Sequence, residues 1–343
     1  MSFKAVQLIA PSQLRFIDVE PQPLKENEIR VQVAVAGVCG SDLKNILAPV
    51  MTPQIPGHEF SGSIIEVGRH LKGKFVRDER VTAFPMFGCL KCKACVFKNY
   101  RDCADKKSLG FQLPGAFAQE VIIDGTFIIR LKDEITYEQG ALLEPFCCGY
   151  RLMKEMEKDF SCPQDKHIVI VGDGPIALAD LQALQSQSFK HITIIGKHSN
   201  RMGIAQRLNA HVIQFSDNYL KELRKLGGID VCIMAAMAQE VLRDIIPLMN
   251  KGAIVYPQTR VNDKDILKQM SERNICLGRA FAYFMDDFDQ VMNLMADKRI
   301  NTDIMVTKRI ALSEVAGSFE HLFSKSDQMK LLMVNTDFRM EKF

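Results

Sequence analysis

The sequence has no apolar run that approaches the roughly 20 residues needed to span a bilayer. Its first residues, MSFKAVQLIAPSQLRF, lack both a long apolar segment and a small-residue cleavage site, so no secretory signal peptide is predicted. No block of Lys and Arg with interleaved aromatic residues occurs, and the net charge is only +3, which argues against nucleic-acid binding. We therefore expect a cytoplasmic protein with neither a membrane nor a nucleic acid as its partner.

Internal repeats and low-complexity segments are also absent from the sequence. The composition, with 25% charged residues, is typical of a globular protein. At 343 residues the chain is too long for one ordinary core, so two domains are expected. In a cytoplasmic chain, the ten cysteines are expected to be metal ligands or buried thiols rather than disulfides.

The first third of the chain has the short alternating runs of a β-rich domain, barrel-like or sandwich-like. Gly, Pro and charged turns separate the predicted strands, which cover residues 5–9, 14–19, 29–35, 62–67, 80–83 and 117–123.

The pattern changes near residue 136. Thr136 and Gln139 form a capping-box pattern, which predicts a helix that is interrupted or kinked at Pro145. Apolar strands then alternate with helices or amphipathic stretches, which predicts a parallel sheet covered on both faces. The predicted strands are 167–172, 191–196, 212–215, 230–236, 253–257 and 275–278, and the clearest helices are 175–187 and 200–208. A helix around 312–323 and a strand at 329–335 are consistent with a return to the first domain.

The stretch GVCGSDLKNILAPVMTPQIPGHE, residues 37–59, contains a candidate metal site. Cys39, His58 and Glu59 are the side-chain types that hold zinc in catalytic sites. Ser41 and Asp42 place a hydroxyl and a second carboxylate beside the thiol. The alternative is that Cys39 is a small core residue and that the Gly-His-Glu sequence is a turn.

A second group of cysteines lies in one short segment with the spacing C-x2-C-x2-C-x7-C. Its members are Cys89, Cys92, Cys95 and Cys103. Four thiolates within fifteen residues are typical of a closed tetrahedral structural zinc site. An iron–sulfur cluster and four unrelated cysteines are the alternatives.

The sequence VGDGPIA, residues 171–177, ends a predicted strand and begins a predicted helix. It fits the dinucleotide-binding pattern G-x-G-x-x-G/A, with Gly172, Gly174 and Ala177 at the small-residue positions. The helix N-terminus would present free N–H groups to a pyrophosphate.

The end of the second strand of this unit, residues 196–201, has no acid. NAD-binding proteins usually have an Asp or Glu there, which bonds the ribose hydroxyls. Lys197 and Arg201 would instead attract a 2′-phosphate, so NADP(H) is predicted over NAD(H). The alternative is that both cations are ordinary solvated residues.

With these motifs together, the chain resembles the zinc-dependent medium-chain dehydrogenases, in particular the branch of sorbitol, threonine and galactitol-phosphate dehydrogenases. The resemblance rests on GVCGSD (37–42), GHEFSG (57–62), the cysteine lobe (89–103), GAFAQEVII (115–123), LLEPF (142–146) and VGDGPIA (171–177). It implies an α/β protein with a GroES-like β-rich catalytic domain (1–145 and 286–343) and a doubly wound Rossmann cofactor domain (146–285). It also implies a homo-oligomer, dimer or tetramer.

The resemblance further implies roles for individual residues, with two zinc ions per chain. Cys39, His58 and Glu59 would be ligands of the catalytic zinc, and Glu144 either a fourth ligand or a partner of the zinc-bound water. Ser41 would pass on the hydroxyl proton, and Asp42 would support His58. Residues 172, 174, 175 and 176 (Gly172, Gly174, Pro175, Ile176) would cradle the pyrophosphate. Lys44 stands where many relatives have a histidine of the proton relay, which leaves the outer end of the relay undefined.

The expected activity is reversible oxidation of a secondary alcohol, such as a polyol, a sugar alcohol or its phosphate, to a ketone. Zinc would act as a Lewis acid, and hydride would pass to a nicotinamide cofactor. The alternatives are a non-catalytic member of the superfamily and a zinc-free, quinone-reductase-like member. The presence of all five catalytic candidates argues against a non-catalytic member; these are Cys39, Ser41, His58, Glu59 and Glu144. The cysteine lobe and the Gly-His-Glu sequence argue against a zinc-free member. The sequence does not identify the alcohol.

Overall fold

The computed structural model of the chain describes residues 2–279, 282–316 and 328–338. It divides the chain into two compact units: Met1–Glu144 with Phe284–Ala296 and Val306–Phe343, and Pro145–Tyr283 with Asp297–Met305. The division falls within two residues of the predicted boundaries except in one segment. Asp297–Met305 belongs to the second unit rather than to the first, and there the backbone N–H of Asn301 donates to Gln182 Oε1 at 2.7 Å.

The first unit is rich in strands, as predicted. Its strands are β1 (Phe3–Ala10), β2 (Gln13–Val19), β3 (Glu28–Gly37), β4 (Glu59–Val67), β5 (Arg80–Ala83), β6 (Met86–Phe87), β7 (Lys107–Ser108), β8 (Glu120–Asp124), β9 (Ile128–Arg130), β16 (Val306–Ala311) and β17 (Lys330–Val334). Its helices are α1 (Gly40–Leu47), α2 (Lys93–Val96) and α9 (Asp287–Ala296), with 3₁₀ turns η1 (Arg69–Leu71), η2 (Tyr100–Asp102) and η6 (Leu312–Glu314).

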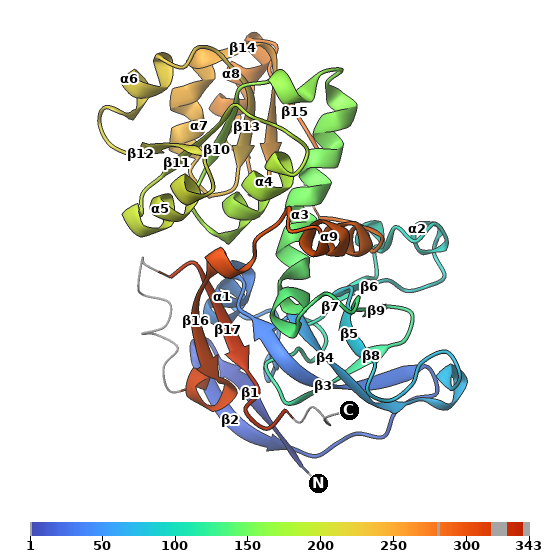
Figure 1. Cartoon of the computed structure of the whole chain (residues 1–343). Coiled ribbons are helices and arrows are strands. Elements are labelled where there is room, and N and C mark those ends of the chain that lie inside the picture. The colour runs from blue at the N-terminus through green and yellow to red at the C-terminus, as the bar shows by residue number, and fades with distance from the viewer. Residues whose placement is uncertain (1, 280–281, 317–327, 339–343) are drawn as a thin grey trace. The chain divides into compact units, whose positions relative to one another are not determined.

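A seven-stranded sheet organises this unit (Figure 1). Its strand order is β16-β17-β3-β4-β5-β9, and β8 pairs with β3. The antiparallel pairing of β3 with β4 sets Gly37 opposite Glu59, and that of β17 with β3 sets Leu332 opposite Gly37. Three segments far apart in the sequence are therefore neighbours where β3 ends and β4 begins.

The second unit is a parallel sheet flanked by helices (Figure 1). Its strands are β10 (Ile168–Val171), β11 (Ile192–Gly196), β12 (His211–Gln214), β13 (Ile229–Met234), β14 (Met249–Pro257) and β15 (Cys276–Leu277). Its helices are α4 (Pro175–Gln185), α5 (Ser199–Arg207), α6 (Tyr219–Arg224), α7 (Gln239–Ile245) and α8 (Lys264–Glu272), with η3 (Pro163–Asp165), η4 (Ile246–Leu248) and η5 (Asp303–Met305). The order β12-β11-β10-β13-β14-β15 is that of a dinucleotide-binding doubly wound fold, which confirms the predicted fold class.

Side chains alternate across this sheet. Val169 and Val171 of β10 belong to a buried apolar cluster with residues of α6, α7 and α8. The intervening Ile168 and Ile170 are also fully buried but lie outside that cluster. Both faces are therefore covered, which explains why the strands are apolar throughout rather than alternating.

The long helix α3 (Tyr137–Asp159) begins in the first unit and continues in the second. The predicted capping box is confirmed: Thr136 N–H donates to Gln139 Oε1 at 2.9 Å, and Gln139 N–H donates to Thr136 Oγ1 at 3.2 Å. Of the two predicted effects of Pro145, an interruption is wrong, because the helix is continuous there, and a kink stays a prediction. Complete burial of Leu142 and Phe146 on either side offsets the hydrogen bond that proline removes.

The predicted helix at 312–323 starts with η6, and its part from residue 317 onward lies outside the described residues. The predicted last strand is β17. Within the described part of the chain, every helix is too short or too polar to cross a membrane.

Asp180, in α4, is fully buried, and its ionisation makes the stability of the fold depend on pH. Burial raises the pKa of its carboxyl to about 8, and Gln258 Nε2 donates to Oδ1 at 2.8 Å. Because the folded pKa lies above the unfolded one, the fold retains a proton that the unfolded chain releases. Stability is therefore lost as the pH rises from about 4 towards about 8, by up to about 1.4 kcal/mol per pH unit.

Asp180→Asn, which mimics the neutral acid, is expected to raise the melting temperature by several degrees at pH 8 and by much less at pH 5. Thermal unfolding of both proteins across this range measures the difference. Asp217→Asn, at an exposed position, is the matched control and should change neither value. A gain of equal size at both pH values would contradict the assignment of the cost to ionisation.

Candidate metal and cofactor sites

Cys39, His58 and Glu59 come together as the sequence predicts. Their ligand atoms all lie within 4.8 Å of one another. Cys39 is the residue before α1, and Glu59 is the first residue of β4. A Cβ on Gly37 would collide with the Glu59 carboxylate, so the glycine leaves the room that this group needs.

Asp42 fixes two members of this group. Its carboxylate accepts a hydrogen bond from the Cys39 N–H at 2.9 Å and lies 3.1 Å from His58 Nδ1. Burial alone lowers the pKa of His58, but the charge and hydrogen bond of Asp42 raise it well above its usual value. The same negative charge would stabilise a metal ion, and the contact at Nδ1 leaves Nε2 as the ring nitrogen for a metal.

Ser41 also lies beside the group, since its Oγ donates to Cys39 Sγ at 3.2 Å. Lys44 is exposed on α1. Glu144 lies in α3 and is partly buried. It is not one of the three residues whose ligand atoms converge, but its charge helps to raise the pKa of Lys330.

Lys330 is the residue of this site that the sequence analysis missed. It is the first residue of β17, it is 2% exposed, and its Nζ donates to Glu59 Oε1 at 2.6 Å and also forms an ion pair with Oε2. Burial alone lowers the pKa of this ammonium, but the charges of Glu59, Cys39 and Glu144 raise it overall. Lys330 and Glu59 are 271 positions apart in the sequence, so no local pattern reveals the pair.

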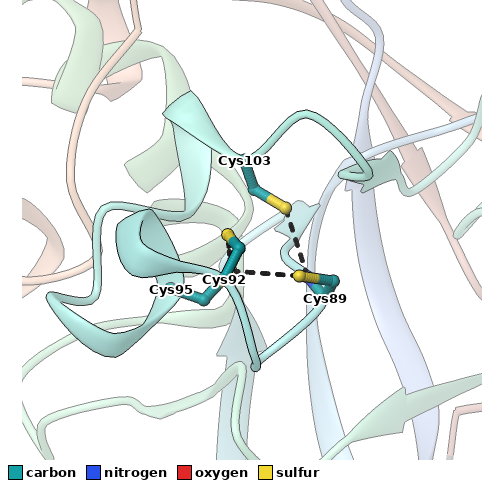
Figure 2. A group of neighbouring side chains, drawn as sticks. All are labelled: Cys89, Cys92, Cys95 and Cys103. Carbon is teal, nitrogen blue, oxygen red and sulfur yellow. Dashed lines mark hydrogen bonds between the residues drawn. The ribbon is translucent and has the colours of Figure 1, made fainter.

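The four lobe cysteines also converge, as Figure 2 shows. Their sulfur atoms lie within 4.8 Å of one another; Cys92 Sγ is 3.5 Å from Cys95 Sγ, and Cys89 Sγ is 4.0 Å from Cys95 Sγ. A Cβ on Gly88 would lie only 2.5 Å from Cys95 Sγ, so the turn leaves space for the sulfurs alone.

The thiols of this lobe differ in acidity. The backbone N–H groups of Lys91 and Cys92 lower the pKa of Cys89 to about 6, whereas burial raises that of Cys95 to about 12. Four sulfurs at these distances fit a single tetrahedral metal ion. A metal ion bound there would hold the sulfurs as thiolates and displace their protons.

The glycine motif lies where β10 ends and α4 begins. Gly172 has φ +123°, and a Cβ there would lie 2.9 Å from Ala236 Cβ, so only glycine fits this turn. A Cβ on Gly174 would meet no atom within 4 Å. The space beside Gly174 is open, as it must be where a pyrophosphate approaches the backbone. Pro175 and Ile176 form the first turn of α4, where proline lacks an N–H that the helix does not use.

Beside this motif is a cavity of about 160 Å³, lined by Gly172, Asp173, Gly196, Lys197 and His198 among others. Lys197 thus lines the cavity beside the glycine motif, and Arg201 lies in the first turn of α5. In the sequence, Asp173 is only the variable residue between the two glycines of the motif. The structure places its carboxylate against the end of β11, 2.7 Å from the Lys197 backbone nitrogen.

Comparison with known proteins supports the sequence-based resemblance. The model of the family "Alcohol dehydrogenase GroES-like domain" matches residues 25–133. The chain is 28% identical to D-arabitol-phosphate dehydrogenase of Enterococcus avium over 97% of each chain. It is 30% identical to sorbitol dehydrogenase of Arabidopsis thaliana, over 89% of this chain and 88% of that one. An alcohol dehydrogenase of Escherichia coli CFT073, solved with NADH, shares the fold, with a TM-score of 0.87, 21% identity and coverage of 97% and 99%.

Lys330→Met is expected to lower the free energy of unfolding by about 3 kcal/mol or more, because it leaves the Glu59 carboxylate buried without its partner. Urea unfolding with and without a chelator measures the change. Adding Glu59→Gln to this variant should restore a large part of the loss. Lys308→Met, at an exposed position of the neighbouring strand β16, is the control. Additive losses in the double variant would show that the two side chains do not stabilise each other.

Proposed function

The chain belongs to the medium-chain polyol dehydrogenase family, and from this premise we propose that it is a zinc-dependent enzyme that transfers hydride between a secondary alcohol and a nicotinamide cofactor. The observation that carries the proposal is the convergence of Cys39, His58 and Glu59 within 4.8 Å, with Asp42 held against His58. A thiol, an imidazole and a carboxylate form the donor set of a catalytic zinc site.

In this proposal Cys39, His58 and Glu59 hold the catalytic zinc, and Glu144 is a fourth ligand or bonds a water at the metal. Zinc bound there would supply Lewis acidity, which lowers the pKa of an alcohol. Glu59 would share its carboxylate with Lys330, whose positive charge offsets the surplus of acidic groups around the site.

The remaining residues position groups or move protons. Asp42 holds the His58 ring in one orientation. Ser41 accepts the substrate's hydroxyl proton. To pass its own proton on to water, its O–H must turn away from Cys39 Sγ, to which it now donates a hydrogen bond. Lys44 does not replace the missing histidine in this scheme, and the proton passes from Ser41 to water.

For the cofactor, Gly172, Gly174, Pro175 and Ile176 would hold the pyrophosphate of a nicotinamide dinucleotide. Lys197 and Arg201 are the basis for predicting NADP(H) over NAD(H), and this preference stays a prediction. The cytoplasmic location and the homo-oligomer also remain predictions.

We assign a second, structural zinc to Cys89, Cys92, Cys95 and Cys103. The distances among their sulfur atoms support one closed tetrahedral site. It would stabilise the lobe and take no part in the reaction.

For the substrate, the relatives act on sorbitol and on D-arabitol phosphate, which supports a polyol, a sugar alcohol or its phosphate. The relatives give no support to a non-catalytic or a zinc-free, quinone-reductase-like member.

Cys39→Ser and Cys103→Ser are each expected to remove one of two zinc ions per chain, with different consequences. Cys39→Ser should lower turnover by about a thousandfold or more while the melting temperature changes little. Cys103→Ser should lower the melting temperature by about 5 °C or more. Metal analysis, activity and thermal unfolding distinguish the two sites. Cys162→Ser, at an exposed thiol outside both groups, is the control. Full turnover by a Cys39→Ser protein that has lost its metal would refute the zinc mechanism.

A panel of polyols and their phosphates, assayed with NAD⁺ and NADP⁺, tests the substrate and the cofactor. We expect at least one polyol or polyol phosphate to be oxidised to a ketone, with ketone reduction in the reverse direction. Reduction of quinones without alcohol oxidation would favour the quinone-reductase alternative. A strong preference for NAD⁺ would refute the prediction drawn from Lys197 and Arg201.

A further inference from the structure

Asp173 has an unusual position for the middle residue of a Gly-x-Gly turn. Its side chain is 8% exposed, and its Oδ2 accepts hydrogen bonds from the backbone N–H groups of Lys197 and His198, each at 2.7 Å. These two amides lie where β11 ends and the chain turns into α5. Two adjacent N–H groups directed at one point form an anion-binding arrangement, and here the anion is part of the protein.

The positive side chains nearby are also engaged. His198 Nδ1 lies 3.0 Å from Asp173 Oδ1, and Arg201 Nη1 lies 3.7 Å from the same oxygen. The Lys197 ammonium lies over the Phe215 ring, 4.9 Å from its centroid. The groups that the sequence assigns to a 2′-phosphate therefore already have protein partners.

The position of this carboxylate corresponds to a known subsite of the fold. In doubly wound dinucleotide-binding proteins, an acid about 20 residues after the glycine motif, at the end of the second strand, bonds the ribose 2′-hydroxyl. Here a carboxylate reaches the same strand end from the glycine turn itself. It also lines the cavity of about 160 Å³ beside that turn.

Gly196 makes this reach possible. A Cβ at residue 196 would lie 2.3 Å from Met202 Sδ and 2.7 Å from both Cβ and Oδ2 of Asp173. A larger residue at the end of β11 would therefore collide with the Met202 side chain and with the carboxylate that the two amides hold. The absence of an acid at the end of the second strand, read from the sequence as favouring NADP(H), is therefore what lets Asp173 occupy this place.

We propose that Asp173 determines the cofactor's 2′ substituent, so that the site selects NAD(H) against NADP(H). The carboxylate accepts from the ribose hydroxyl, occupies the two amides that an added phosphate would need, and repels the phosphate charge. This offsets the attraction from Lys197 and Arg201. The inference rests on the proposed nicotinamide-dependent function and reverses the preference predicted from the sequence.

The test measures binding rather than turnover. Dissociation constants of NAD⁺ and NADP⁺ are determined by isothermal titration calorimetry for the wild type, Asp173→Ala and Asp173→Asn. The wild type should bind NAD⁺ at least about tenfold more tightly. Asp173→Ala, which frees both amides and removes the charge, should shift the ratio towards NADP⁺ by about twentyfold or more. Asp173→Asn, which keeps an acceptor for the amides, should give a smaller shift in the same direction.

Glu240→Gln is the matched control, because Glu240 is an exposed acid that lines the same cavity. Its ratio should stay within about twofold of the wild type. An equal shift in this variant would show a general charge effect and overturn the role of Asp173.

The outcomes separate the two proposals. If both dinucleotides bind and the ratio is unchanged in Asp173→Ala, this inference fails while the dehydrogenase function stands. If the folded wild type and variants bind neither dinucleotide, the proposed function fails, and this inference with it. Should Asp173→Ala fail to fold by circular dichroism, the near-isosteric Asp173→Asn decides, and an unchanged ratio there overturns the inference.

Discussion

The buried ion pair between Lys330 and Glu59 is the constraint on which the first unit depends. A carboxylate withdrawn from water is unfavourable unless it is paired and hydrogen-bonded, and the Lys330 ammonium, 2.6 Å away, provides both. The pair joins the first residue of β4 to the first residue of β17, on opposite flanks of β3. Because it compensates one acid, the fold can hold a thiol, an imidazole and a second carboxylate, Asp42, in the same small volume before any metal is bound.

Buried carboxylates in the second unit follow the same rule, with two different results. The Asp173 carboxylate lies against two backbone N–H groups and the side chains of His198 and Arg201. Asp180 receives one amide hydrogen bond and, among the residues that the structure describes, no cation pairs with it; burial raises its pKa to about 8. One carboxylate thus has several hydrogen-bond and charged partners, whereas burial favours the neutral form of the other at the expense of stability.

Local pattern was sufficient for the fold class and for both cysteine-containing groups. The apolar strands of the second unit, the capping box at Thr136 and the spacing of the lobe cysteines all express short-range constraints, and the structure reproduces them. Lys330 and Asp173 escaped prediction because their roles come from strand pairing and turn geometry. The sequence around Lys330 does not distinguish it from a surface lysine, because only the pairing of β17 with β3 brings it to Glu59. Asp173 occupies a variable position of the glycine motif, and its contact with the end of β11 depends on the missing side chain at Gly196. The continuity of α3 through Pro145 likewise depends on burial, which helix propensity does not include.

The close approach of Gly196 to Asp173 also restricts how the cofactor site can change over evolutionary time. An acid placed at residue 196, a conventional means of recognising the ribose, would collide with both Met202 and Asp173, since even a Cβ there lies 2.3 Å from Met202 Sδ and 2.7 Å from Asp173. The two substitutions are therefore epistatic: residue 173 must become small, and the Met202 side chain must move, before the strand end can gain a side chain. The intermediate sequence, small at both positions, has no acid at the ribose and exposes both amides to a phosphate. If Asp173 selects NAD(H) as proposed, a lineage that exchanges one acid for the other passes through a state of reversed or relaxed cofactor choice.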